Sequence, residues 1–131
     1  MADLVIAGAG PQALSLCCQL LQKRPYWRRR VRILDPSGRW LSRWERQMRQ
    51  FEIPWLRSPS PHHPHPNPNA LRSYAQLGQR SDELEGPYGQ PHTGSFNTFC
   101  MQVAEAFGLA DAVEPLAVEA VGLGRAPRDP P

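Results

Sequence analysis

The residues best suited to chemistry lie in a glycine-rich turn near the start of the chain and in one acid that follows it. The turn reads Gly8–Ala9–Gly10–Pro11–Gln12–Ala13, a G-x-G-x-x-A pattern. In this pattern the first glycine permits a tight turn, the second lets the backbone approach a pyrophosphate, and the small last residue lets a helix pack close to a strand. Asp35 lies where a carboxylate can accept hydrogen bonds from the hydroxyls of an adenosine ribose. The combination predicts a dinucleotide site.

The segments around this turn are the ones that the pattern requires. Leu4–Ala7 is an apolar run of strand type, the chain from Pro11 to about Lys23 has helical spacing, and residues 31–35 form a second strand that ends in the acid. The helix N-terminus offers free N–H groups and the positive end of a dipole to phosphates. We expect an α/β fold in which Leu116–Val121 is a third parallel strand, with the order third, second, first, or with the third loosely attached. An ordinary βαβ turn without a ligand is the alternative interpretation.

An apolar stripe at helical spacing follows Asp35. Trp40, Trp44, Met48 and Phe51 recur at positions i, i+4, i+8 and i+11. For the last three residues we expect packing in the core. Trp40 follows a glycine-containing turn beside the acid, and we expect it close enough to the nucleotide to cover a cofactor.

Two further helices are predicted near the middle and toward the end of the chain. They span roughly residues 70–77 and 96–107, with Ser95 as the N-cap of the second and Gly108 ending it. Residues 122–131 are too rich in Gly, Pro and charge to fold on their own, so we expect a disordered tail.

A proline-rich loop spans residues 54–68 and carries six of the 15 prolines, with His62, His63 and His65 close together. Alternating prolines favour an extended, polyproline-like path on which neighbouring side chains radiate from the axis. Three such imidazoles do not converge on one ion, and no cysteine or acid lies nearby to complete a ligand set. We therefore expect an ordered loop that crosses a cofactor, and no metal site.

Positive charge is concentrated in residues 23–49, which hold ten Lys/Arg and two acids, a net charge of +8 against −5 for the rest of the chain. With interleaved tryptophans, such a block could indicate nucleic-acid binding. However, Arg28–Arg30 lie in a helix-to-strand connection, and Arg43, Arg46 and Arg49 recur every three residues as on one exposed helix face. We expect solvated surface and no nucleic-acid partner.

Length and composition place the chain in a broad class. Its 131 residues suffice for one domain with a modest core. No apolar run reaches about 18 residues and no signal-peptide pattern is present, so we expect no membrane span. Cys17, Cys18 and Cys100 have no C-x-x-C spacing, which points to buried thiols of a reducing compartment and a cytoplasmic protein.

Several segments together resemble a known family. Gly8–Leu16, Asp35–Trp40, Leu56–Pro59 and His63–Pro68 are similar to the N-terminal segment of FAD/NAD(P)-binding proteins of the lysine/ornithine N-hydroxylase type, which are flavin-dependent monooxygenases. The resemblance implies that residues 1–121 form an incomplete, Rossmann-like FAD-binding βαβ domain. That domain would be the N-terminal portion of a larger fold with two dinucleotide domains.

The resemblance also implies roles for particular residues. The glycine turn would carry the FAD pyrophosphate, Asp35 would hold the adenosine ribose, and Trp40 would lie near the flavin end. Arg57 and the loop after it would lie beside the isoalloxazine. The cofactor contacts implied in this way are Gly8, Ala9, Gly10, Pro11, Gln12, Asp35, Pro36, Trp40 and Arg57. The resemblance assigns no catalytic residue. It implies oxygen transfer to an amine or a similar soft nucleophile, without naming the substrate.

The chain also departs from the family pattern. Family members continue with a second Rossmann unit for NADPH, whereas Gly122–Leu123–Gly124 precedes no helix and no second G-x-G-x-x-G is found. We expect a truncated or separately encoded piece that shows no appreciable NADPH oxidation alone. One function is the FAD-binding portion of an NAD(P)H-using monooxygenase or oxidoreductase, active only when another chain or an oligomer partner completes it, or not active at all. The alternative is a non-catalytic nucleotide-binding or protein-interaction module, with the His/Pro loop as its recognition segment.

Overall fold

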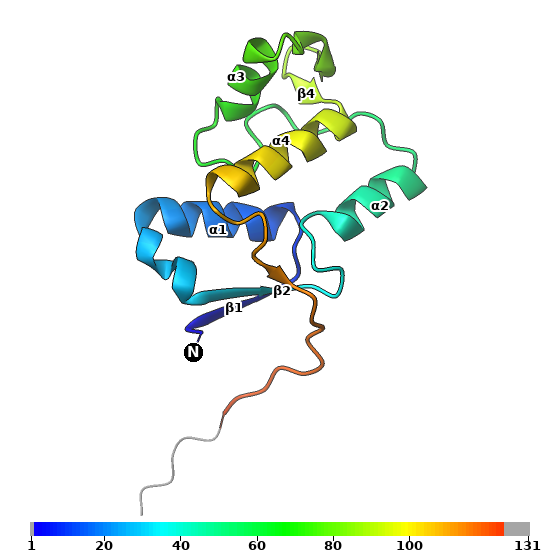
Figure 1. Cartoon of the computed structure of the whole chain (residues 1–131). Coiled ribbons are helices and arrows are strands. Elements are labelled where there is room, and N and C mark those ends of the chain that lie inside the picture. Colours follow the sequence, from blue (N-terminus) through cyan, green and yellow to red (C-terminus); the bar gives the residue numbers. More distant parts are fainter. Residues whose placement is uncertain (1, 125–131) are drawn as a thin grey trace, which may run out of the picture.

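A computed structural model describes residues 2–124 of the chain (Figure 1). In the list that follows, η denotes a 3-10 helix. The elements along the chain are β1 (Leu4–Ala7), α1 (Pro11–Lys23), η1 (Pro25–Arg29), β2 (Val31–Leu34), α2 (Ser42–Gln50), α3 (Ala70–Leu77), η2 (Ser81–Glu83), β3 (Leu84–Glu85), β4 (Gln90–Pro91), α4 (Thr93–Ala106) and β5 (Val113–Glu114). The predicted disorder of the tail falls mostly on residues 125–131, which lie outside the described residues.

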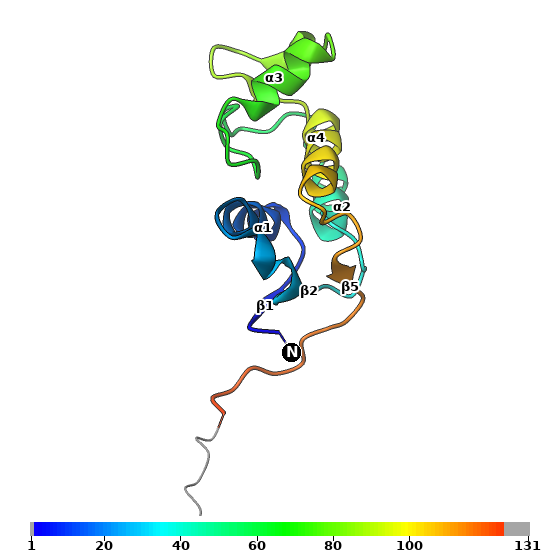
Figure 2. The same cartoon turned by 60° about the vertical axis from the view of Figure 1, so that its left-hand side comes forward.

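The main sheet has three parallel strands in the order β1-β2-β5. Leu4 lies opposite Val31 and Ala7 opposite Leu34, while Ile33 lies opposite Val113. Helices α1, α2 and α4 all lie on the same side of this sheet in both views (Figures 1 and 2). The α/β class and the strand order third, second, first are therefore confirmed, and the arrangement is compatible with a fragment of a Rossmann-like fold.

The position of the third strand was predicted wrongly. The strand that pairs with β2 is β5, whereas residues 116–121 have no regular structure. Leu116 and Val118 alternate in sequence, but their side chains are 47% and 41% exposed because nothing in the described structure covers them. Pro115 has no N–H to donate to a sheet ladder, so the chain leaves the sheet directly after β5.

The core lies between the sheet and the helices above it. It includes Leu14, Cys17 and Cys18 from α1, Ile33 from β2 and Cys100 from α4. All three cysteines are free and buried, as expected. Burial raises the pKa of Cys17 to about 11 and that of Cys18 to about 12, and it raises the pKa of Cys100 further. These thiols therefore pack as small apolar groups at neutral pH.

Helix α2 confirms part of the predicted stripe. Trp44 packs against the core with its ring centroid 5.4 Å from that of Phe96, and Met48 is partly buried. Phe51 is 66% exposed, so its predicted core position is wrong. The helix ends at Gln50, and the last apolar residue of the stripe therefore falls beyond the last turn that faces the core.

The arginines were predicted correctly as surface. Arg28–Arg30 are exposed in the connection between α1 and β2, and Arg43, Arg46 and Arg49 are exposed on α2. This exposure matches the solvated surface expected from their spacing.

Helices α3 and α4 form where the sequence predicts them, but the start of α4 differs. His92 is the N-cap, and its Nδ1 accepts a hydrogen bond from the N–H of Gly94 over 3.2 Å. Ser95 lies inside the helix and its hydroxyl donates to Glu83, so its predicted capping role is wrong. The end was predicted correctly, since Gly108 follows the helix with φ +69°.

The proline-rich loop does not follow the extended path that was predicted. The N–H of His62 donates to the carbonyl of Pro59 over 3.0 Å, so the loop folds into turns. Pro64 is fully buried, and the ring of His63 lies edge-on to Phe99 with centroids 5.2 Å apart. Packing against α4 therefore overrides the local preference of proline for an extended chain.

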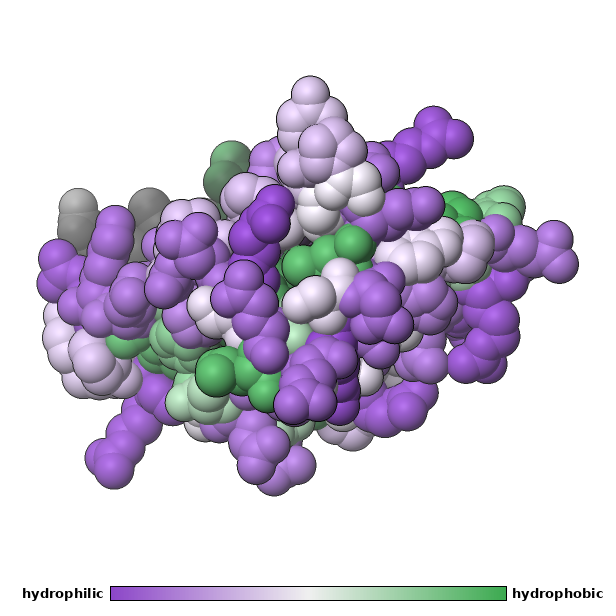
Figure 3. Space-filling model, turned by 90° about the horizontal axis from the view of Figure 1, so that it is seen from above, coloured by the Kyte–Doolittle hydropathy of each residue, from purple (hydrophilic) through white to green (hydrophobic). Residues whose placement is uncertain are grey.

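The surface is mostly polar on the face seen from above (Figure 3). Hydrophilic side chains cover most of this face, and hydrophobic ones form separate small patches. Among residues 2–124, no helix is both long and apolar enough to cross a membrane.

Candidate functional site

The glycine turn between β1 and α1 has the backbone geometry that its sequence predicts. Gly8 has φ +104°, a conformation that other residues rarely adopt, and its N–H donates to the carbonyl of Leu34 over 2.7 Å. Gly10 is the N-cap of α1 with φ −84°, so its backbone alone does not require glycine. A Cβ built on Gly10 would meet no atom within 4 Å. The space beside Gly10 is therefore open, as it must be if a ligand is to lie close to the backbone of the turn.

The first turn of α1 is free to bind an anion. Pro11 occupies the first position, and the N–H groups of Gln12 and Ala13 are the first that the helix offers without an internal partner. No side chain caps this end, and its first turn contains no acid. The positive end of the helix dipole is therefore not neutralised by the protein itself.

A buried leucine ties the glycine turn to the segment after β2. The N–H of Leu41 donates to the carbonyl of Ala9 over 2.7 Å, and both residues are buried. Leu41 has φ 61°, a left-handed conformation that is unfavourable for a branched side chain. Full burial of its side chain holds it there, so the geometry of the turn is set by tertiary packing as well as by its own residues.

Two cavities meet at the glycine turn. The Asp35 cavity, of about 350 Å³, is lined by Asp35, Arg39 and Arg43 among others. The Arg57 cavity, of about 740 Å³, extends in the other direction to Arg57 and the proline-rich loop. Both are lined by Gly8, Gly10, Pro11 and Trp44. The turn therefore lies between two adjoining cavities, one lined by an acid and the other by Arg57, and we call the two together the groove.

Asp35 stabilises its own turn and keeps one oxygen available. Its Oδ2 accepts hydrogen bonds from the backbone N–H of Ser37 over 3.0 Å and from the Ser37 hydroxyl. The N–H of Gly38 also donates to the Asp35 carbonyl over 3.0 Å. Among the described residues, no donor contacts Oδ1. This oxygen is the one that can accept a hydrogen bond from a ligand.

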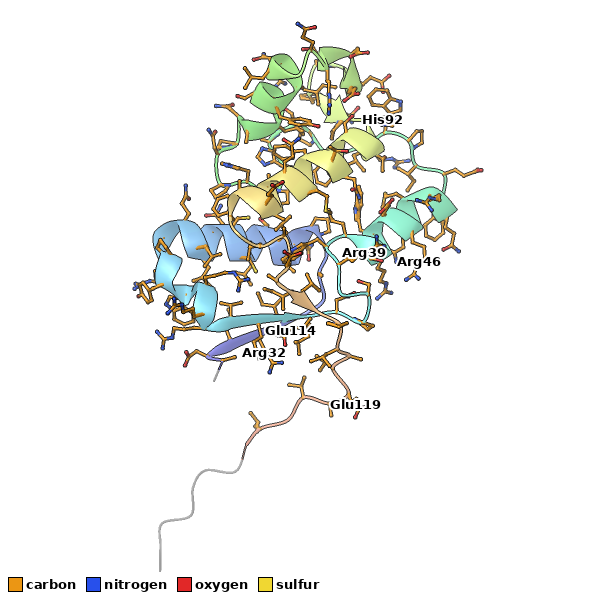
Figure 4. The ribbon with its side chains drawn as sticks, in the orientation of Figure 1. Arg32, Arg39, Arg46, His92, Glu114 and Glu119 are labelled. Atoms are coloured by element: carbon orange, nitrogen blue, oxygen red, sulfur yellow. The ribbon has the colours of Figure 1, made fainter. Side chains whose placement is uncertain are left out.

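Several residues of the Asp35 cavity were not predicted as site residues. Arg39, Arg43 and Gln47 all line it, and their spacing of four places them on one side of α2 and its preceding turn. Figure 4 shows Arg39 just before α2 and Arg46 on the helix itself. The spacing was visible in the sequence, but the same pattern also fits a solvated helix face.

The backbone around Arg57 is held by a short antiparallel hairpin, β3-β4. The N–H of Leu56 donates to the carbonyl of Pro91 over 2.9 Å, and the side-chain amide of Gln90 donates to the carbonyl of Arg57 over 2.9 Å. The Arg57 side chain is exposed, and within residues 2–124 it forms no ion pair. Its guanidinium is therefore available to a ligand.

Two histidines of the proline-rich loop line the same cavity. His62 is exposed, whereas His63 is partly buried and its Nε2 lies 3.2 Å from the carbonyl of Pro68. Because a carbonyl only accepts, Nε2 carries the proton in this contact. Burial lowers the pKa of His63, which keeps the ring neutral at neutral pH. In the described part of the chain, no group of three His, Cys, Asp or Glu residues could hold a metal ion.

Two of the predicted contacts lie away from the groove. Trp40 is buried, and its Nε1–H donates to the carbonyl of Leu109 over 2.7 Å. It lines a separate hollow with Asn97 and Met101, so it does not cover the glycine turn. Pro36 is exposed in the turn after β2 and lines neither cavity of the groove. The groove thus brings together Gly8, Ala9, Gly10, Pro11, Gln12, Asp35 and Arg57.

Comparison with known proteins adds no relative. No protein-family model matches the chain, and neither a curated protein nor a solved structure matches it.

Proposed function

We propose that the chain binds an adenine dinucleotide, FAD, in the groove formed by the two cavities. It would thereby act as the FAD-binding portion of a Rossmann-like flavoprotein. The observation that carries this proposal is the open space over Gly10, at the point where the two cavities meet and where α1 presents its uncapped N-terminus. A dinucleotide site is expected to consist of a strand, a glycine turn, a helix and a second strand that is followed by an acid, which is the order found here.

The charges of the groove support one direction for the bound dinucleotide. Its pyrophosphate fits beside Gly10 and the first N–H groups of α1, because these offer donors and positive potential. The ribose of the adenosine fits at Asp35, whose Oδ1 is free to accept a hydrogen bond from a hydroxyl. The redox ring then extends toward Arg57.

The walls of the Arg57 cavity suit a flat ring. Trp44, Met48 and Phe96 supply apolar surface, and Arg57 and Ser58 supply polar groups at the rim. Binding sites for cofactors generally combine a mostly apolar lining with a few polar groups that fix orientation. FAD would supply two-electron redox chemistry there, while these side chains bind and orient it and exclude water.

The resemblance to flavin-dependent N-hydroxylases supports a monooxygenase or oxidoreductase reaction with NAD(P)H as the reductant. It also supports an amine or a similar nucleophile as the acceptor.

A non-catalytic nucleotide-binding module is the second candidate, favoured by the fact that the Asp35 cavity and the glycine turn fit any adenine nucleotide. A yellow purified protein with flavin absorbance would support the first candidate over the second.

Calorimetric titration of the purified chain with FAD and with NADPH tests the proposal. Wild type is expected to bind FAD more tightly than NADPH. Gly10→Val is expected to abolish binding, because its side chain enters the space that the pyrophosphate needs, where a Cβ meets no protein atom within 4 Å. Gly122→Val is the matched control, since a Cβ there also meets nothing within 4 Å and Gly122 lies outside the groove. It is expected to bind as wild type does.

Two results would contradict the proposal. If wild type binds neither dinucleotide, the groove is not a dinucleotide site. If NADPH binds more tightly than FAD, the identity of the cofactor is wrong. Circular dichroism of Gly10→Val distinguishes loss of binding from loss of fold.

A further inference from the structure

The lining of the Arg57 cavity contains positive charge and no negative charge among the described residues. None of the residues that line it is acidic, whereas Arg57, His62 and the N-terminus of α1 all face it. The acid of the groove, Asp35, lines the other cavity. The one carboxylate of α2, that of Glu45, also lies elsewhere, since it pairs with Arg49 over 3.1 Å and lines the hollow beside Trp40. A group bound at the Arg57 end therefore experiences positive charge without a compensating negative one.

The main chain that carries Arg57 is held in position by hydrogen bonds on both sides. Besides the bonds from Leu56 to Pro91 and from Gln90 to Arg57, the N–H of Ser60 donates to the carbonyl of Tyr88 over 2.9 Å. The segment that carries Arg57 is thus fixed along the β3-β4 hairpin. The main chain at Arg57 is thereby placed at the rim of the cavity, and the exposed side chain extends from this point without a partner among residues 2–124.

The apolar walls of the cavity strengthen the electrostatic interaction between Arg57 and a bound group. Trp44, Met48, Leu56 and Phe96 line the cavity beside Arg57, and water is displaced from them when a ring enters. Electrostatic interactions are stronger in such surroundings than in water. A negatively charged ring is therefore bound more tightly in this cavity, and a positively charged ring is bound less tightly.

We infer that this cavity is built for a redox ring that becomes negatively charged on reduction, and that Arg57 makes it bind the reduced ring more tightly than the oxidised one. The inference rests on the proposed function, with FAD as the ligand. The oxidised isoalloxazine is neutral, and it becomes an anion when it takes up two electrons from a reductant and one proton from solvent. An oxidised nicotinamide ring is instead a cation, which the same cavity disfavours.

The consequence is thermodynamic. A site that binds the reduced form more tightly makes reduction of the bound ring easier by the same ratio, because binding and reduction are linked in one cycle. Charge near the ring is a recognised means by which a protein tunes a flavin. Arg57 is therefore a positioning and tuning residue of the site.

Anaerobic titration with oxidised FAD and with dithionite-reduced FAD tests this inference, at a pH where the reduced ring is singly deprotonated. Wild type is expected to bind reduced FAD about tenfold more tightly or better, as one charge-assisted hydrogen bond allows. Arg57→Gln should bring the ratio of the two affinities close to one, and Arg57→Lys should keep most of it. Arg46→Gln is the matched control, because Arg46 is exposed on α2 and lines neither cavity.

The midpoint potential of bound FAD gives a second readout that does not depend on enzyme activity. It is expected to lie above that of free FAD in wild type and to fall in Arg57→Gln. A wild-type affinity ratio of one, or a ratio unchanged in Arg57→Gln, would overturn the inference while leaving FAD binding intact. Absence of binding in both redox states would instead overturn the proposed function itself.

Discussion

The indole Nε1–H of Trp40 donates a hydrogen bond to the main-chain carbonyl of Leu109 over 2.7 Å, although the two residues lie 69 positions apart. Both are buried, with Trp40 5% exposed and Leu109 1% exposed. The bond joins the turn after β2 to the turn after α4, close to β5. It therefore helps to hold β5 beside β2, and its tryptophan belongs to the core.

Trp40→Phe is expected to destabilise the fold by about 1–3 kcal/mol, because the buried carbonyl of Leu109 then lacks its donor. Urea denaturation followed by circular dichroism measures this difference. Trp55→Phe is the control, since Trp55 is only partly buried and its indole makes no hydrogen bond within residues 2–124. An equal loss in both variants would mean that ring volume, and not the bond, is what matters.

The two glycines of the turn are expected to respond differently to alanine. Gly8→Ala should lower the free energy of unfolding by about 1–3 kcal/mol, because φ +104° is unfavourable for any residue with a Cβ. Gly10→Ala should change it by less than about 0.5 kcal/mol, since its φ of −84° is ordinary and its Cβ meets open space. Thermal and urea unfolding of the two variants provide the comparison. Equal destabilisation would show that Gly10 has a structural role.

Asp35→Ala is expected to weaken FAD binding by about 1.5–3 kcal/mol, or roughly 10- to 150-fold, through loss of a charged hydrogen bond to the ribose. This loss should be smaller than that of Gly10→Val, which blocks the pyrophosphate. Because Asp35 also accepts from Ser37, the control is Ser37→Ala, which loses the hydroxyl but keeps the backbone donor. A Ser37→Ala variant as weak as Asp35→Ala would assign the effect to the turn instead of the ribose.

Stability should fall as the pH is lowered below about 6.5, the ordinary pKa of an imidazole. Burial lowers the pKa of His63 in the folded state, and burial also lowers that of His65. The unfolded chain thus binds more protons in this range, so protonation favours unfolding, and the stabilisation is lost as the pH falls through the folded-state pKa. Urea midpoints measured from acid to neutral pH test this slope.

The dependence of stability on pH should be shallower in His63→Phe than in wild type, because the variant lacks this titratable imidazole. Its neutral aromatic ring can still pack against Phe99. His62→Phe, at an exposed position, serves as the control. If removal of His63 leaves the slope unchanged, other groups cause the pH dependence.

The βαβ unit at the start could be predicted because its signals are local. Apolar runs, a glycine turn and helical spacing are all found within Leu4–Leu34, and the structure reproduces β1, α1 and β2 there with at most one residue of difference. The boundaries of α3 and the glycine after α4 were predictable for the same reason. Each depends on neighbours a few residues away.

The errors arise where distant contacts compete with a local pattern. Residues 116–121 alternate as a strand does, but β2 pairs with Val113–Glu114 and Pro115 then ends the ladder. The proline-rich loop has the composition of an extended segment, but burial of Pro64 against the rest of the chain folds it into turns. The pairing of Val113–Glu114 with β2 and the burial of Pro64 both depend on residues far away in the sequence.

By itself, the sequence determined the glycine turn, the acid that follows the second strand, and the α/β order of elements. These properties follow from backbone conformation and short-range periodicity. Only the tertiary structure decided that Arg39 and Arg43 line the groove with that turn, whereas Trp40 is held in the core by Leu109. Which side chains meet in space depends on how α2, α4 and the loops pack over the sheet, and that packing is set by contacts between residues far apart in the chain.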